Sequence, residues 1–175
     1  MHDGVRLSNL LGAAALAITD RTLSGISAAA GIGASPAAAV VVLSGSPGLG
    51  ITELGRRVGL SQSAAARMVD SLEAADLARR ASGTGRFVRV TLTDHGRRTV
   101  SKVLGARDEA LAEVLSGFDE GERKALESLL GKLLTGLYQE VGNADLLCRL
   151  CDRGSCVDGA VCPVGQAERD ERGGA

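Results

Sequence analysis

Four cysteines that lie close together near the C-terminal end carry the most distinctive chemistry in this sequence. The first 147 residues contain no cysteine, and the motif that follows reads Cys-x2-Cys-x4-Cys-x5-Cys-Pro. In a chain with no mark of secretion, thiols clustered in this way favour a shared ligand over structural disulfides. We therefore expect a metal site, with a disulfide redox switch or chance clustering as the alternatives. The expected ligands are Cys148, Cys151, Cys156 and Cys162.

The spacing of these thiols does not decide the metal. An all-cysteine zinc site usually has two short Cys-x-x-Cys knuckles, and this sequence has one. Iron–sulfur sites also use four thiolates, accept irregular spacing and often end in Cys-Pro. The pattern slightly favours an iron–sulfur cluster over zinc. Such a site would lie just beyond the last long helix, where it could sense iron, metal or redox state and change the geometry of a dimer.

No other set of residues has the pattern of a catalytic site. His2 lies at the start of the chain, and His95 falls in the first turn of an expected helix, where exposure is the ordinary outcome. The glycines between residues 45 and 50 lack the spacing of a phosphate-binding loop. No nucleophile–base pair or carboxylate pair stands out. We therefore expect a protein that is not an enzyme.

The composition indicates a globular chain with a small-residue core. Of 175 residues, 45% are hydrophobic, 23% are charged and only three are aromatic. The core must therefore consist of Ala, Val and Leu, and an aromatic-lined pocket is not expected. The longest apolar runs, 10–18 and 37–43, fall short of the roughly 20 residues that span a bilayer, and the start lacks a signal peptide. We expect a cytoplasmic protein with no membrane partner.

The near-neutral net charge of −1 hides a basic middle segment. Residues 49–100 carry nine Arg and five acidic residues, whereas residues 101–175 carry nine basic and fourteen acidic residues. Phosphate binding needs a basic face rather than a basic protein. The middle segment is therefore the candidate for nucleic-acid contact.

Helical patterns precede and fill this segment. The first runs from Leu7 to Ile26 and ends at glycines, and a second, apolar on nearly all sides, begins at Ser35-Pro36 with Ser35 as N-cap. Two short helices follow, one capped by Thr52 and ending at Gly59, the other capped by Ser61. Two helices joined by a short turn that contains Gly are typical of a helix-turn-helix. The second helix, 62–75, should bury Ala65, Met68, Val69 and Leu72 and expose Gln62, Ser63, Ala66, Arg67 and Asp70.

A two-stranded hairpin is expected next, over residues 77–81 and 87–93 around a turn at 82–85. A hairpin after a helix-turn-helix is the wing of a winged helix, and arginines that flank its turn would meet the phosphate backbone. They are Arg79, Arg80, Arg86 and Arg89.

Two long helices complete the pattern, one capped by Thr93 and one by Asp119. The first should turn Val100, Val103, Leu104, Leu111 and Val114 inward. The second carries a wide apolar stripe that packs on the preceding helix or, as we favour, also on a second subunit. The stripe consists of Leu126, Leu129, Leu130, Leu133, Leu134, Leu137 and Val141.

The order of these elements resembles the MarR family of bacterial transcription factors over residues 5–142. The resemblance lies in ITELGRRVGLSQSAAARMVDSLEAADLARR (51–80) and RFVRVTLTDHGRR (86–98), the latter similar to the family's wing strand and Leu-Thr-x-x-Gly. It implies a homodimer on a pseudo-palindromic operator in double-stranded DNA, with repression as the expected action and an unknown small-molecule effector. It also implies that the recognition helix enters the major groove with Ser61, Gln62, Ser63 and Arg67, although Ser61 is equally an N-cap.

The wing departs from the family pattern at its tip. The family usually carries Asp-x-Arg there, and this chain has Thr84-Gly85-Arg86. A Thr hydroxyl cannot form an ion pair, so we expect Arg86 to be held less firmly and its DNA contact to be more sensitive to salt.

The sequence thus predicts a mainly α protein with a small β wing (α+β). We expect an N-terminal dimerisation helix at 1–34, a winged helix-turn-helix at 35–98, C-terminal dimerisation helices at 99–142 and a Cys-rich extension with a flexible tail at 143–175. The alternative function is a winged-helix protein-interaction module with a structural or electron-carrying metal site. Its interface would need large apolar anchors, which the expected recognition face lacks.

Overall fold

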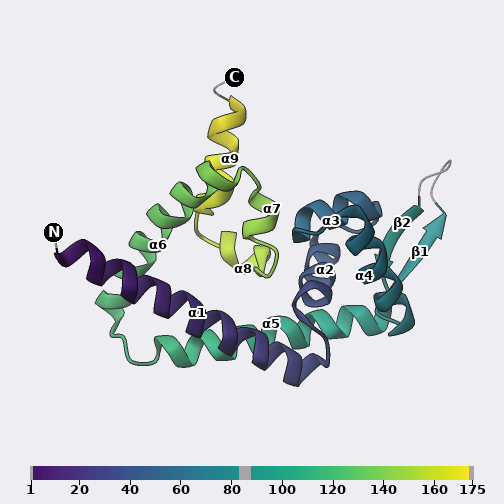
Figure 1. Cartoon of the computed structure of the whole chain (residues 1–175), viewed down its shortest axis with the longest axis horizontal. Helices are drawn as coiled ribbons and strands as arrows, with labels where there is room; N and C mark the ends of the chain where they lie inside the picture. The colour runs from purple at the N-terminus through teal and green to yellow at the C-terminus, as the bar shows by residue number, and fades with distance from the viewer. Residues whose placement is uncertain (1, 83–87, 174–175) are drawn as a thin grey trace.

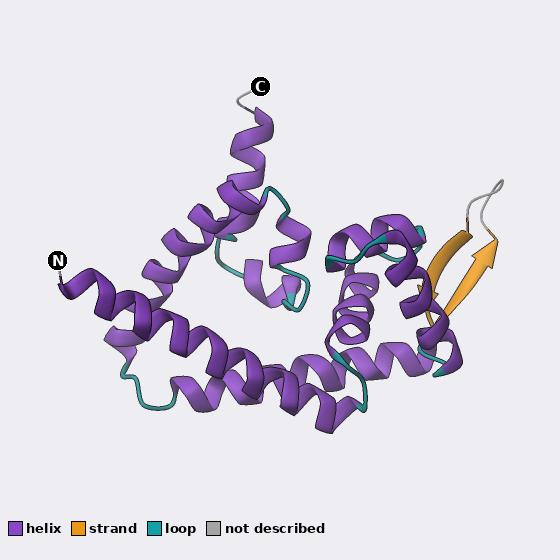
Figure 2. Cartoon of the chain, in the orientation of Figure 1, coloured by secondary structure: helices purple, strands orange, loops and turns teal. Residues whose placement is uncertain are grey.

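A computed structural model describes residues 2–82 and 88–173 of the chain. It is mainly helical, with a two-stranded antiparallel sheet, which confirms the expected fold class (Figures 1 and 2). The elements are α1 (His2–Ala30), α2 (Ala34–Gly45), α3 (Ile51–Val58), α4 (Gln62–Ala74), β1 (Ala78–Ser82), β2 (Val88–Leu92), α5 (Asp94–Leu115), α6 (Glu120–Val141), α7 (Ala144–Leu147), α8 (Arg153–Val157) and α9 (Pro163–Gly173).

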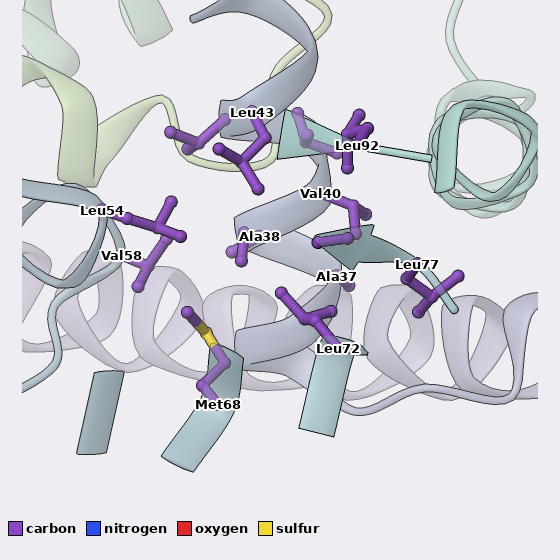
Figure 3. Packing of buried hydrophobic residues seen from close by; sticks show 14 of the residues in the cluster. Ala37, Ala38, Val40, Leu43, Leu54, Val58, Met68, Leu72, Leu77 and Leu92 are labelled. Carbon is purple, nitrogen blue, oxygen red and sulfur yellow. The ribbon is translucent and has the colours of Figure 1, made fainter. Parts of the chain in front are cut away.

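The core surrounds α2, whose seven consecutive residues from Ala37 to Leu43 are all buried. Helices α3 and α4, the sheet and the first half of α5 pack around it (Figure 3). The expected N-cap was wrong, because Gly33 is extended and its carbonyl accepts the first helical hydrogen bond, from Ala37 N at 3.0 Å. Ser35 therefore lies in the first turn. Pro36 keeps its expected place in that turn, where a missing N–H costs little.

The helix-turn-helix consists of α3 and α4. Gly50 is the N-cap of α3 and makes no side-chain bond, so Thr52 lies inside the helix and does not cap it as expected. At the end of α3, Gly59 adopts φ +77°, a left-handed conformation that favours glycine. Ser61 does cap α4, since its Oγ accepts a hydrogen bond from Ala64 N at 3.4 Å. The expected inner face of α4 is buried.

The two strands pair in the register Arg79↔Thr91 and Ala81↔Arg89, which confirms the hairpin. Leu49 adds an isolated bridge to Val90 on the other side of β2. The hairpin leads into α5 through Thr93, whose Oγ1 accepts a hydrogen bond from Gly96 N at 2.9 Å. A Cβ placed on Gly96 would lie 1.9 Å from the carbonyl oxygen of Leu77, so only glycine allows α5 to start this close to the hairpin.

Helices α1 and α5 lie against each other along much of their length (Figure 1). Arg21 of α1 forms an ion pair with Glu113 of α5. Val100 and Val103 are buried as expected, whereas Val114 is 37% exposed and the expectation for that residue was wrong. Val114 lies near the end of α5, beyond the part that reaches the core.

Helix α6 turns away from α5 and packs instead against α9 (Figure 1). Asp119 and Glu122 form a capping box at its start, as the Asp119 cap predicted. Tyr138 of α6 is buried, and its hydroxyl donates to Glu171 at 2.6 Å. Within the described parts of the chain, the apolar stripe therefore does not pack on the preceding helix; Leu129 is 61% exposed.

Among the residues that the structure describes, no single helix is both long and apolar enough to cross a membrane. By length and composition alone, α1 from Gly4 and α2 would pass that test as a pair bent by 76°.

Candidate nucleic-acid interface and four-cysteine lobe

The outer face of α4 presents polar side chains at its N-terminal end. Gln62, Ser63 and Arg67 are exposed, opposite the buried face. Ser61 Oγ caps the helix and lies 3.4 Å from Ser63 Oγ, so its hydroxyl is engaged within the helix as well as exposed. Together with the free amides of the first turn, this face offers donors and acceptors of the kind that read base edges and bind phosphate.

Two of the wing arginines are exposed on one face of the hairpin. The register places Arg79 and Arg89 on the same side of the two strands, opposite the side where Ala78, Val90 and Leu92 enter the core. Arg89 also lies against Gly48 in the loop that precedes α3. Thr84, Gly85 and Arg86 lie outside the described residues.

Arg80 is held differently from its neighbours. Its guanidinium forms ion pairs with Asp70 at 2.7 Å and with Glu73, both on α4, and its backbone N–H donates to Glu73 Oε1 at 2.7 Å. The hydrogen bond to Asp70 is the main reason that the pKa of Arg80 is raised. Two carboxylates thus offset its charge, and the side chain fastens the hairpin to α4.

A further basic group at the base of the hairpin was not predicted from the sequence. Arg79, His95, Arg97 and Arg98 border a shallow cavity of about 330 Å³ with Asp94. Arg97 donates to the Leu92 carbonyl at 3.0 Å and pairs with Asp94, and this pairing lowers the pKa of the Asp94 carboxyl. Arg98 is exposed beside them. The signal was present in the dipeptide Arg97-Arg98, one turn into α5, but only the fold brings it next to Arg79.

The C-terminal segment 143–165 forms a small lobe, here called the four-cysteine lobe, that contains α7, α8 and the start of α9. All four cysteines line one cavity of about 180 Å³, and all four are free thiols. Cys148 interacts with Cys151 strongly enough to shift the pKa of both thiols, and burial together with the neighbouring Cys162 raises the pKa of Cys156. The fold thus brings all four thiols to the wall of one cavity.

The environment of the first pair separates the acidities of its thiols. The hydrogen bond from Cys148 lowers the pKa of Cys151 to about 6; burial opposes this, and Arg107, Arg153 and Arg149 add to it. The same hydrogen bond, together with burial, raises the pKa of Cys148. Cys151 is therefore the thiol that carries a thiolate most readily, the form that binds metals and attacks electrophiles.

The donor set suits a soft metal, but it is not closed around one ion. Among the described residues, no three His, Cys, Asp or Glu side chains are grouped tightly enough to hold a metal as they stand. The cavity is larger than a single ion needs, and thiolate pairs on its walls are the ligands that zinc and iron–sulfur clusters use.

The lobe also contacts the helix-turn-helix directly, which the sequence did not predict. Asp145 Oδ2 accepts a hydrogen bond from Arg56 at 3.1 Å and lies 3.4 Å from Arg57 Nε, while its Oδ1 accepts from Arg153 at 2.7 Å. Burial would raise the pKa of Asp145, but the Arg153 hydrogen bond and the Arg57 charge outweigh it, so the pKa is lowered. Glu53 completes the group, and hydrogen bonds from Arg56 and Arg57 lower its pKa to about 2.

Comparison with known proteins agrees with the fold. The model of the IclR helix-turn-helix domain matches residues 41–82. No curated protein matches the chain. Among solved structures, a MarR family protein from Bacillus stearothermophilus is 27% identical, with a TM-score of 0.69 over 81% of this chain and 97% of that one.

Two further structures are similar over comparable lengths. The YusO protein from Bacillus subtilis is 26% identical, with a TM-score of 0.65 over 76% of this chain and 96% of its own. The MarR family protein Rv2887 from Mycobacterium tuberculosis is 25% identical, with a TM-score of 0.61 over 73% of this chain and 92% of its own. With its helix-turn-helix, wing and flanking long helices, the chain is a DNA-binding transcriptional regulator whose fold is similar to that of MarR family proteins.

Proposed function

We propose that this regulator is a homodimer that binds a pseudo-palindromic operator, acts as a repressor, and responds to metal or redox state through its four-cysteine lobe. The observation that carries the sensor assignment is the gathering of all four thiols at one cavity beside the helix-turn-helix.

Uncovered apolar faces on the terminal helices support the dimer. Ile26, near the end of α1, is buried, whereas the outer half of that helix exposes a run of large aliphatic side chains. Helix α6 exposes a second such run. Exposed apolar surface on this scale is typical of an obligate interface. The residues are Val5, Leu7, Leu10, Leu11 and Leu16 on α1, and Leu129, Leu130, Leu133, Leu137 and Val141 on α6.

The polar face of α4 supports major-groove reading by Gln62, Ser63 and Arg67, with Ser61 as both cap and phosphate neighbour. Arg79 and Arg89 are the wing contacts that we propose, and Arg86 remains a proposal from the sequence alone. Arg80 was also expected at the DNA; because Asp70 and Glu73 hold it, we propose that it contributes by orienting the wing.

Binding to DNA can be tested with a fluorescent fragment from the region upstream of the protein's own gene. Arg67→Ala should weaken binding about tenfold or more and reduce the dependence on salt. Arg172→Ala, which removes an exposed arginine on α9, is the matched control and should leave affinity unchanged. Equal affinities for the two variants would remove Arg67 from the interface. No binding of the wild type to this fragment or to random DNA would favour the protein-interaction module instead.

Four thiols on the walls of one cavity support a metal at the lobe, with a slight preference for an iron–sulfur cluster over zinc. When bound, such a group would cross-link the two pairs and make the lobe depend on iron supply or oxidants. Cys148, Cys151, Cys156 and Cys162 would be its ligands, and Arg107, Arg149 and Arg153 would offset the thiolate charge.

Anaerobic purification followed by an absorbance scan and metal analysis tests this assignment. A brown protein with iron and sulfide would support the cluster. A colourless protein with one zinc per chain would assign zinc and end the iron–sulfur assignment. Protein that holds neither metal, with four free thiols, would refute the metal site and leave a disulfide switch.

A further inference from the structure

The four-cysteine lobe and the helix-turn-helix share one carboxylate. Asp145 turns Oδ1 toward Arg153 of the lobe at 2.7 Å and Oδ2 toward Arg56 of α3 at 3.1 Å. The Asp145 side chain is only 17% exposed, whereas the side chains of Arg56 and Arg153 are 50% and 48% exposed. Removal of a carboxylate from such a group leaves several cations facing one another.

Two more contacts hold the lobe at the C-terminal end of α3. Asn143 Nδ2 donates to the Arg56 carbonyl at 3.2 Å. Leu146 packs on Gly59 so closely that a Cβ there would lie 2.8 Å from Leu146 Cδ1. Gly59 begins the turn that ends at Ser61, the N-cap of α4. The lobe therefore contacts α3 at the point from which the recognition helix departs, and Figure 1 shows α7 beside α3.

The same elements are continuous with the thiols. Helix α7 ends at Leu147, so Cys148 is the next residue, and Arg153 lies between Cys151 and Cys156 in the chain. A displacement of Cys148 or Cys151 would therefore act directly on α7 or on Arg153. Either movement alters the bonds that Asp145 makes with α3.

We propose that Asp145 is the positioning residue through which the four-cysteine lobe sets the orientation of α3 and, through the turn at Gly59, of α4. The inference rests on the proposed function in taking the thiols as the sensor. It names the route by which their state reaches DNA within one chain, independently of any change in the dimer.

The lobe has a second area of contact with the domain that offers another route. Cys148, Cys151 and Arg153 share a cavity with Val42 of α2 and Leu104 of α5. A signal through this contact would shift α2 and α5 and would not need the Asp145 carboxylate. The experiment must therefore separate the two routes.

Hydrogen–deuterium exchange of full-length reduced protein is the direct test, because it needs neither bound metal nor DNA. The backbone amides of residues 51–65 report on α3 and the start of α4. Cys148→Ser/Cys151→Ser should accelerate their exchange about fivefold or more. In an Asp145→Asn background, the same two cysteine substitutions should change exchange by less than about twofold, because the link that Asp145 makes between the lobe and α3 is already broken.

Two variants separate positioning from general damage. Asp145→Glu keeps the charge, so in this background the Cys148→Ser/Cys151→Ser substitutions should again accelerate exchange of residues 51–65. Asp158→Asn, the same substitution at an exposed position of the lobe, should behave as wild type. The dissociation constant of an operator probe should follow the same pattern across the set of variants.

Two outcomes would overturn the inference. One is an equal response to the cysteine pair in the wild-type and Asp145→Asn backgrounds, which would assign the signal to the α2 and α5 contact. The other is no response of residues 51–65 to the cysteine pair in the wild-type background. Failure of the wild type to bind DNA or metal would count against the proposed function only, since exchange still decides whether Asp145 connects lobe and helix.

Discussion

The glycine at the start of α5 provides a sharp test of how the wing is seated. At Gly96, an added Cβ would lie 1.9 Å from the Leu77 carbonyl oxygen, far inside van der Waals contact. That oxygen also accepts the hydrogen bond from Thr93 N at 3.1 Å. Gly96→Ala must therefore push the hairpin and α5 apart and break this bond.

The expected cost follows from these contacts. Loss of a buried hydrogen bond costs about 1–3 kcal/mol, and forcing extra volume into a packed site costs about 1–3 kcal/mol. The higher helix propensity of Ala than of Gly offsets about 1 kcal/mol of this cost. Combining these terms, we expect Gly96→Ala to lower the free energy of unfolding by about 3 kcal/mol. Gly105→Ala, in the same helix with none of the described atoms within 4 Å of the new Cβ, should instead raise it by about 0.5–1 kcal/mol.

Urea denaturation followed by far-UV circular dichroism measures both, since the chain has no Trp. Protein concentration must be fixed, because the proposed dimer would contribute to stability. The close packing of α5 on the hairpin is refuted if the free energy of unfolding of Gly96→Ala is within about 1 kcal/mol of the wild-type value. It is also refuted if Gly96→Ala, like Gly105→Ala, raises the free energy of unfolding.

Three further predictions concern the interface and its supports. Ser61→Ala should lower the free energy of unfolding by about 1 kcal/mol through loss of the α4 cap, measured by urea titration. Ser71→Ala, at an exposed position in the last turn of α4, should cost nothing, and equal costs would contradict the cap. Because Glu53 has its pKa lowered from 4.5 to about 2, its ion pairs stabilise the fold fully above pH 4.5 and lose that effect as the pH falls towards 2. The gap in melting temperature between wild type and Glu53→Gln should therefore be constant from about pH 7 to 5 and shrink below, and a gap that stays unchanged down to about pH 2.5 would refute the pairing. Leu129→Glu should shift the mass measured by light scattering from dimer towards monomer, since it places charge on the exposed α6 face; Ser128→Glu is the neighbouring control, and a dimer unaffected by Leu129→Glu would move the interface elsewhere.

Periodicity and turn chemistry were enough to predict the winged helix. The 3.6-residue pattern of α4, the Ser61 cap and the alternation in β2 are local signals, and each was found where expected. The caps of α2 and α3 were misplaced because the helices start at glycines, Gly33 and Gly50, that cap through backbone geometry alone. A side-chain rule looks for Ser or Thr and so selects a residue already inside the helix.

The site was predicted less completely, because its decisive contacts join residues far apart in the sequence. The four thiols stand close together in the chain, so their grouping was visible. Nothing local shows that Asp145 meets Arg56, or that Asp70 and Glu73 on α4 hold Arg80. Arg80 and Arg79 are adjacent in the sequence, and only the pleat of β1 sends one towards α4 and the other to the open face.

The attachment of Arg80 to α4 has a mechanical consequence. Asp70 and Glu73 lie on successive turns of the recognition helix and hold the first wing strand by side chain and backbone together. These bonds connect α4 rigidly to the wing, so a tilt of α4 would move the wing with it. In the proposed complex with DNA, a displacement of α4 out of the major groove would therefore also move Arg79 and Arg89 away from the phosphates, so both contacts would be lost together.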